Sequence, residues 1–156
     1  MNHQSISQRL ETLGITLPDP PKPVASYVPA VVSGGLCYTS GQLPLRNGQL
    51  VAQGRVGDRV TLADAQGAAR QSCLNAIAVA AQAAGGVDRL QRVVKVVGFV
   101  QCADDFHQQP QVINGASQLL EEIFGEHGQH ARSAVGTNAL PLDASVEIEM
   151  IFELGE

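Results

Sequence analysis

Apolar positions near the start of the chain recur at helical spacing, at Ile6, Leu10 and Leu13. Gly14 interrupts this pattern, and glycine commonly ends a helix. A short amphipathic helix is therefore predicted, followed by the proline-rich connector TLPDPPKPV, residues 16–24. Too little precedes the connector to fold alone, so we expect residues 1–156 to form a single domain in which residues 1–23 supply the helix and connector.

Strand-like patterns follow the connector. Residues 24–45 are rich in β-branched and aromatic side chains and are interrupted by Gly34-Gly35, which predicts two strands joined by a turn. Asn47-Gly48 then lies between two apolar segments. Both residues tolerate positive φ, so this pair predicts a tight hairpin.

Two long helices and three further strands complete the predicted fold. Thr61 can cap a helix that ends at Gly85-Gly86, and a second helix is predicted over residues 110–125. Strands are expected at residues 93–100, 131–138 and 145–153. Two helices cannot cover both faces of such a sheet, so we expect an α+β fold with one uncovered sheet face. Self-association would bury that face.

Composition and charge exclude several classes of function. The formal net charge is −5 and no run of Lys or Arg is present, which argues against a nucleic-acid-binding protein. No secretory signal begins the sequence, and no apolar run approaches the roughly 18 residues of a membrane span. The three cysteines are far apart and form no CxxC motif, so we expect buried thiols in a reduced, cytoplasmic protein.

Known catalytic and cofactor motifs are absent from the sequence. No nucleophile elbow, P-loop or dinucleotide fingerprint occurs. His127 and His130 lie three residues apart with no obvious third ligand, so surface or capping histidines are expected rather than a metal site.

Arg132 is the remaining candidate for chemistry. On a strand, Arg132, Ala134 and Gly136 point to one face, and two small neighbours would leave a hollow around the guanidinium. A planar guanidinium in such a hollow can bind a carboxylate through two parallel hydrogen bonds. The alternative is a surface arginine on an edge strand, which the residues alone favour. Glu147 and Glu149 likewise fit the solvated face of a half-buried strand.

Five segments resemble a known family in order and in nearly the same spacing. They are ASYVPAV, YTSGQLPL, VVKVVGFV, VINGASQLLEEIFG and ARSAVGTNALPLDASVEIEM. The resemblance is to the reactive intermediate deaminase A (RidA, or YjgF) family and runs from about Tyr27 to the end of the chain. The chain is most similar to a longer branch with an N-terminal helix and the sequence ARSAVG in place of ARS-x-VEV.

The resemblance implies a chorismate-mutase-like fold, with a mixed sheet and two helices packed on one face. It also implies a homotrimer whose sheets form a central barrel, with clefts between subunits. Active members of the family hydrolyse 2-imino and 2-enamino acids without a cofactor or a metal.

The family's site residues carry over onto this sequence position by position. By resemblance, Arg132 would bind the substrate carboxylate and Glu147 would hold the attacking water. The other matched positions would line the cleft: Tyr27, Ser40, Gly41, Asn114 and Ala134. The deaminase subgroup commonly has cysteine at the position of Ala134, whose backbone N–H can still serve a carboxylate, and an acidic residue at the position of Gly136.

Three functions are compatible with this resemblance. The first is a hydrolase of the 2-iminobutanoate/2-iminopropanoate deaminase type, acting on a small 2-imino carboxylate. The second is a protein that binds a 2-imino or 2-oxo carboxylate in the same cleft without turnover. The third is a ribonuclease or translation inhibitor. The Arg132 and Glu147 pair favours the first, while the acidic charge and the scarcity of base-stacking aromatics oppose the third.

Overall fold

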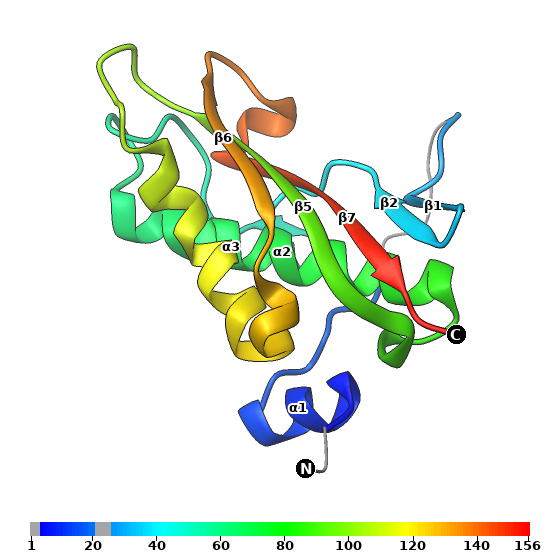
Figure 1. Ribbon diagram of the computed structural model, residues 1–156. Coiled ribbons are helices and arrows are strands. Elements are labelled where there is room, and N and C mark those ends of the chain that lie inside the picture. The colour runs from blue at the N-terminus through cyan, green and yellow to red at the C-terminus, as the bar shows by residue number, and fades with distance from the viewer. Residues whose placement is uncertain (1–3, 21–25) are drawn as a thin grey trace.

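A five-stranded mixed sheet forms the centre of the computed structural model, which describes residues 4–20 and 26–156 (Figure 1). The strand order is β1-β2-β7-β5-β6, in which only β5 and β6 run parallel. The strands are β1 (Ala30–Ser33), β2 (Leu36–Thr39), β5 (Leu90–Gln101), β6 (Ala131–Thr137) and β7 (Val146–Leu154). A separate hairpin, β3 (Leu45–Arg46) and β4 (Gln49–Leu50), turns at Asn47-Gly48 as predicted.

In the described residues, three α-helices accompany the sheet: α1 (Ile6–Leu13), α2 (Leu62–Ala84) and α3 (Gln109–Phe124). The Thr61 hydroxyl accepts a hydrogen bond from the Asp64 amide at the start of α2, and Gly85 ends that helix at φ 90°. Short 3₁₀ segments serve as connectors: η1 (Val87–Arg89), η2 (Gly125–Gly128) and η3 (Pro141–Asp143). No helix in the described ranges has the length and apolarity to cross a membrane.

Both long helices cover the same face of the sheet (Figure 1). Alternate β7 side chains, Val146, Ile148, Met150 and Phe152, are buried on this side. The other face carries apolar side chains that stay partly or largely exposed: Val31, Tyr38, Val97, Phe99, Val135 and Ile151. The predicted α+β fold, with a mixed sheet and two helices on one face, is confirmed.

The two long helices approach each other closely at Gly115. A Cβ atom at this position would overlap the backbone carbonyl of Gln66 on α2, so the helices could not keep their present separation. Small residues at such crossings let backbones touch and leave no space for even one added carbon.

Alanine at Gly115 is therefore expected to lower the free energy of unfolding by about 3 kcal/mol through overpacking. Gly67 is the matched control, because it lies in α2 with nothing within 4 Å of an added Cβ. Gly67→Ala should raise the free energy of unfolding by roughly 0.5–1 kcal/mol, the difference in helix propensity. Urea unfolding at one protein concentration measures both changes, and equal stabilities would show that the helices do not meet as described.

The N-terminal helix is attached at the end of the molecule where α3 finishes. Ser7 donates from its backbone N–H and its hydroxyl to the two carboxylate oxygens of Asp88, each at 2.7 Å. Arg9 Nε donates to the Glu122 carbonyl at 2.9 Å, and Leu10 is buried. The predicted helix is thus present and part of the main body.

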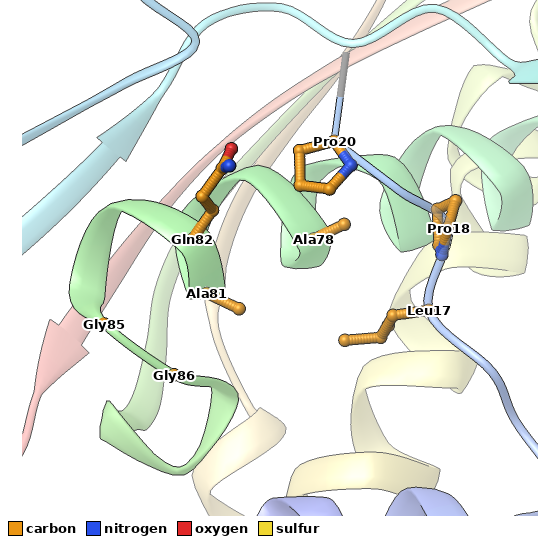
Figure 2. A pocket seen from close by; sticks show the side chains of 8 residues that line it. All are labelled: Leu17, Pro18, Pro20, Ala78, Ala81, Gln82, Gly85 and Gly86. Atoms are coloured by element: carbon orange, nitrogen blue, oxygen red, sulfur yellow. The ribbon is translucent and has the colours of Figure 1, made fainter. Parts of the chain in front are cut away.

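The connector then crosses the C-terminal half of α2. Leu17, Pro18 and Pro20 face Ala78 and Ala81 across a shallow hollow of about 500 Å³ (Figure 2). The rest of the predicted connector, and the predicted start of a strand at Val24, lie outside the described residues.

Candidate functional site

Arg132 lies on β6, an edge strand, with its side chain turned toward α3. Its Nη1 donates to Asn114 Oδ1 at 2.8 Å and to Ser117 Oγ at 3.1 Å. The side chain is half-buried and hydrogen-bonded to α3, and β6 is an edge strand, as the alternative interpretation expected. Within residues 4–20 and 26–156 the one ion pair joins Arg55 and Asp104, so the Arg132 charge has no carboxylate partner there. Nε and Nη2 likewise have no hydrogen-bond partner in the described chain.

The small residues that follow Arg132 have different surroundings. Ala134 is half-buried against the core, opposite Gly98 of β5. A Cβ at Gly136 would lie 2.9 Å from Gln109 Nε2 and 3.0 Å from Cys102 Sγ. Gly136 therefore leaves room for the Gln109 side chain, and the hollow expected beside Arg132 does not extend that far.

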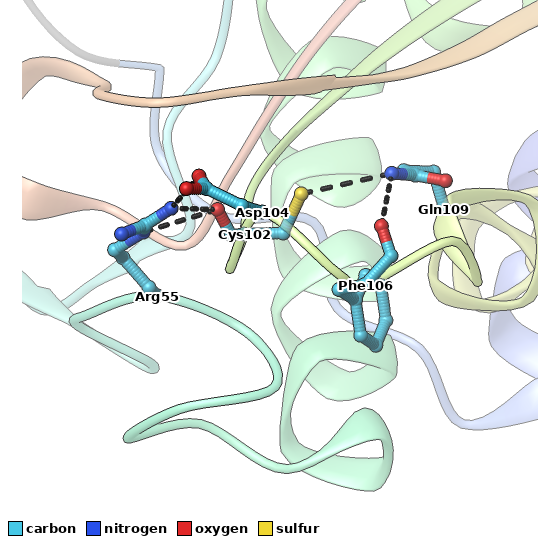
Figure 3. A network of polar contacts seen from close by, with 5 residues as sticks. All are labelled: Arg55, Cys102, Asp104, Phe106 and Gln109. Carbon is cyan, nitrogen blue, oxygen red and sulfur yellow. Dashed lines mark hydrogen bonds and ion pairs between the residues drawn. The ribbon is translucent and has the colours of Figure 1, made fainter.

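A polar network fixes the loop that leads from β5 to α3 (Figure 3). Arg55 donates through Nε and Nη2 to the Cys102 carbonyl, at 3.0 and 2.6 Å, and through Nη2 to Asp104 at 3.0 Å. Gln109 Nε2 donates to the Phe106 carbonyl at 2.9 Å. These bonds fix the start of α3, the helix that carries Asn114 and Ser117.

Glu147 lies on β7 and points to the uncovered face of the sheet. Its carboxylate rests on Gly41, where any Cβ would overlap Glu147 Oε1. Partial burial raises the pKa of Glu147, and repulsion from Glu149 raises it further. A carboxyl group with a raised pKa is suited to exchange protons with a bound water.

Tyr27 and Ser40 are linked to the Glu147 side of the sheet through Gly41, which follows Ser40 at the end of β2. Ser40 Oγ donates to the Val28 carbonyl at 2.6 Å, which ties the end of β2 to the segment that carries Tyr27. Tyr27 is 61% exposed, and it lines a cavity of about 650 Å³ together with Gly41 and Leu142. The glutamate side of the candidate site therefore adjoins an open cavity.

The structure separates the candidate residues into two groups. Arg132 is in register with Val96 of β5, which is buried beneath the helices, and so Arg132 points to the helix side. Glu147 is in register with Phe99 of β5, on the uncovered side. Asn114 and Ala134 belong with Arg132, and Tyr27, Ser40 and Gly41 with Glu147. The two groups do not meet within one chain, so a site that uses both needs a second copy.

Ser117 and His130 are polar partners that the sequence analysis missed. Ser117 Oγ lies 3.0 Å from His130 Nε2, and His130 Nδ1 lies 2.6 Å from the Gly128 carbonyl oxygen. His130 is thus half-buried and bonded at both ring nitrogens, whereas His127 is exposed as predicted. The spacing of the sequence could have identified both residues. Ser117 is three positions after Asn114 and so shares its helix face, and His130 is two positions before Arg132 and so shares its side of the strand.

Comparison with known proteins places the chain in a family. The model of the family described as "YjgF/chorismate_mutase-like, putative endoribonuclease" matches residues 7–154. TCP17 from Trypanosoma cruzi is 40% identical over 150 residues, covering 96% of this chain and 94% of that protein. The 2-iminobutanoate/2-iminopropanoate deaminase of Escherichia coli (strain K12) is 32% identical over 135 residues, covering 84% and 89%.

A solved structure agrees with these sequence matches. The crystal structure of the protein Atu1372 from Agrobacterium tumefaciens is similar with a TM-score of 0.88 and 45% sequence identity, covering 97% of this chain and 94% of that one. Together with the mixed sheet and the two helices on one face, these matches show that the chain belongs to the RidA/YjgF family.

Proposed function

We propose that this protein is a cofactor-independent deaminase that hydrolyses reactive 2-imino and 2-enamino acids to 2-oxo acids and ammonia. The observation that carries the proposal is the pairing of Arg132, a held cation with no carboxylate partner in the described chain, with Glu147, a carboxyl of raised pKa. The first suits a substrate carboxylate and the second an attacking water. The E. coli relative named as a deaminase supports the same reaction.

The site would form between the subunits of a homotrimer. Each chain would supply Arg132, Asn114 and Ala134 to one cleft and Glu147 to the neighbouring cleft. The uncovered sheet face supports this assembly, because Val31 and Val135 there are 51% and 45% exposed. Apolar patches of this kind are usually buried by association.

We expect a stable trimer at micromolar concentration, with three times the 16.4 kDa mass of one chain. Burial of the open sheet face is the physical reason. Sedimentation equilibrium measures the mass directly. A monomer at that concentration would leave Arg132 and Glu147 on separate molecules and would remove the proposed site.

The reaction needs little beyond orientation and one proton carrier. The Arg132 guanidinium would hold the substrate carboxylate, which places the electrophilic C2 carbon of the protonated imine beside a water. Glu147 would accept a proton as the water oxygen bonds to C2, which gives a carbinolamine. Glu147 then returns this proton to the amine, the C2–N bond breaks as ammonia leaves, and the hydroxyl gives up its proton to Glu147 as the carbonyl of the 2-oxo acid forms.

Endoribonuclease activity, which the family description also names, fits this chain less well. RNA binding usually depends on a basic surface, and the formal net charge here is −5 with only 10 Lys and Arg among 156 residues. We therefore propose a small carboxylate rather than RNA as the substrate.

Turnover of freshly generated imines tests the proposed function. An amino-acid oxidase would produce 2-iminopropanoate and 2-iminobutanoate in place, and the rate of 2-oxo acid formation would be followed with and without the protein. Acceleration above spontaneous hydrolysis is the expected result. Binding of 2-oxobutanoate without acceleration would instead show a metabolite-binding protein that uses the same cleft.

A further inference from the structure

We infer that Ser117 and His130 are positioning residues that hold the Arg132 guanidinium in the orientation needed to bind a substrate carboxylate. The inference rests on the carboxylate-binding role proposed for Arg132. It assigns a role to a hydrogen-bonded chain that runs from Gly128 through His130 and Ser117 to Arg132.

Hydrogen-bond chemistry fixes the direction of this chain. The Gly128 carbonyl oxygen can only accept, so His130 Nδ1 carries the proton between them, at 2.6 Å. In the neutral imidazole, Nε2 is then the acceptor, and the Ser117 hydroxyl donates to it across 3.0 Å. The Ser117 oxygen, with its proton committed to His130, presents its lone pairs to Arg132 Nη1 at 3.1 Å.

The two acceptors on Nη1 together fix the plane of the guanidinium. Nη1 has two hydrogens, and Asn114 Oδ1 and Ser117 Oγ accept them from the same helix, α3. Both acceptors are neutral, so they orient the group without cancelling its charge. A carboxylate in either place would compete with the substrate. The N–H groups of Nε and Nη2 remain, and they are the two parallel donors that can pair with a carboxylate.

The backbone around His130 is itself well fixed. Gly128 is buried, and a Cβ there would overlap the Leu120 carbonyl of α3. The carbonyl that orients His130 is therefore packed against the helix that supplies Ser117. His130 and Arg132 are two residues apart along an extended segment, which turns both side chains to α3.

The test compares four single variants with the wild-type protein, and it also compares Arg132→Ala with and without Ser117→Ala. Ser117→Ala and His130→Phe break the chain, and Ser117→Thr keeps a hydroxyl. His127→Phe is the matched control, since the His127 side chain is exposed and makes no hydrogen bond within residues 4–20 and 26–156. The measurements are the Kd for 2-oxobutanoate, the kcat and KM for 2-iminobutanoate, and the rotation rate of the Arg132 guanidinium about its Nε–Cζ bond by ¹⁵N NMR.

Ser117→Ala and His130→Phe should each raise Kd and KM about 5- to 10-fold, the effect of losing one hydrogen bond of ordinary strength, and should leave kcat within about twofold. Ser117→Thr and His127→Phe should bind as the wild type does. In an Arg132→Ala background, adding Ser117→Ala should change Kd less than about twofold, because residues that act through one group are not additive.

Wild-type binding in both Ser117→Ala and His130→Phe would overturn the inference, as would an equal loss in His127→Phe. Failure of the proposed function gives a different result. If the wild type binds 2-oxobutanoate without turning over imines, the Kd comparison still decides the role of Ser117. If it binds no 2-oxo acid, slow guanidinium rotation that becomes fast in Ser117→Ala supports the inference, and unchanged rotation overturns it.

Discussion

Replacing Arg132 with alanine is expected to lower kcat/KM for 2-imino acids by about two to four orders of magnitude. The substrate carboxylate would enter a partly dry cleft without a counter-charge, and breaking such a pair costs roughly 3–5 kcal/mol. The fold should survive, because the Arg132 side chain is only half-buried and fills no core volume. Steady-state kinetics with freshly generated 2-iminobutanoate, together with the circular dichroism spectrum, measure both expectations.

Arg132→Lys is the control that separates charge from geometry. An ammonium group keeps the charge but cannot present two parallel N–H donors, nor fill both hydrogen bonds to Asn114 and Ser117 in the same plane. We expect this variant to recover less than about one of the lost orders of magnitude. Wild-type turnover in both Arg132 variants would mean that the arginine only supports α3 and does not bind substrate.

Glu147→Gln is expected to lower kcat about a hundredfold or more while KM changes little, since general-base catalysis is typically worth that much. The amide keeps the size of the side chain over Gly41 but cannot take a proton from water.

In the wild type, kcat should fall as the pH drops through the Glu147 pKa. Because burial and Glu149 raise that pKa, the acidic limb should lie above the range of an ordinary glutamate. The pH profile of kcat measures this limb, and its persistence in Glu147→Gln would assign it to another group.

The same variant should be at least as stable as the wild type at neutral pH. A carboxyl whose pKa is raised on folding binds more protons in the folded state than in the unfolded state, so stability falls as the pH rises through that interval. Glutamine has no such penalty. Thermal unfolding should show a Tm for Glu147→Gln equal to or above that of the wild type at pH 7.5, and any advantage should disappear in acid. A lower Tm at pH 7.5 would show that the carboxylate stabilises the fold.

Much of the fold was predictable because local signals are strong in this chain. The Asn47-Gly48 hairpin, the Thr61 cap and the Gly85 terminus depend on residues only a few positions apart, and each appears as predicted. Strand ends were less accurate. β5 begins at Leu90 rather than near residue 93, after a turn of 3₁₀ helix and with register shifts against β7. Such irregularities depend on pairing with a distant strand.

The candidate site was predictable only in part. Alternation placed Arg132 and Ala134 on one strand face and Glu147 on a half-buried strand, and the structure agrees. Alternation along one strand shows which residues share a side of that strand. It does not show whether that side is the one that the helices cover. The opposite placement of Arg132 and Glu147 follows from the order β7-β5-β6, which is a long-range property. The bond from Ser117 to His130 likewise depends on how α3 packs beside β6.

Subunit mixing tests most directly the claim that the active site forms between two chains. Arg132→Ala and Glu147→Gln chains, each inactive alone, would be co-expressed with different tags, and the mixed trimers would be purified through both tags. If neighbouring subunits supply the two residues, each two-tag trimer contains one cleft with both residues intact. Activity should then return to about one third of the wild-type value per trimer. Mixed trimers as inactive as the parents would contradict the account.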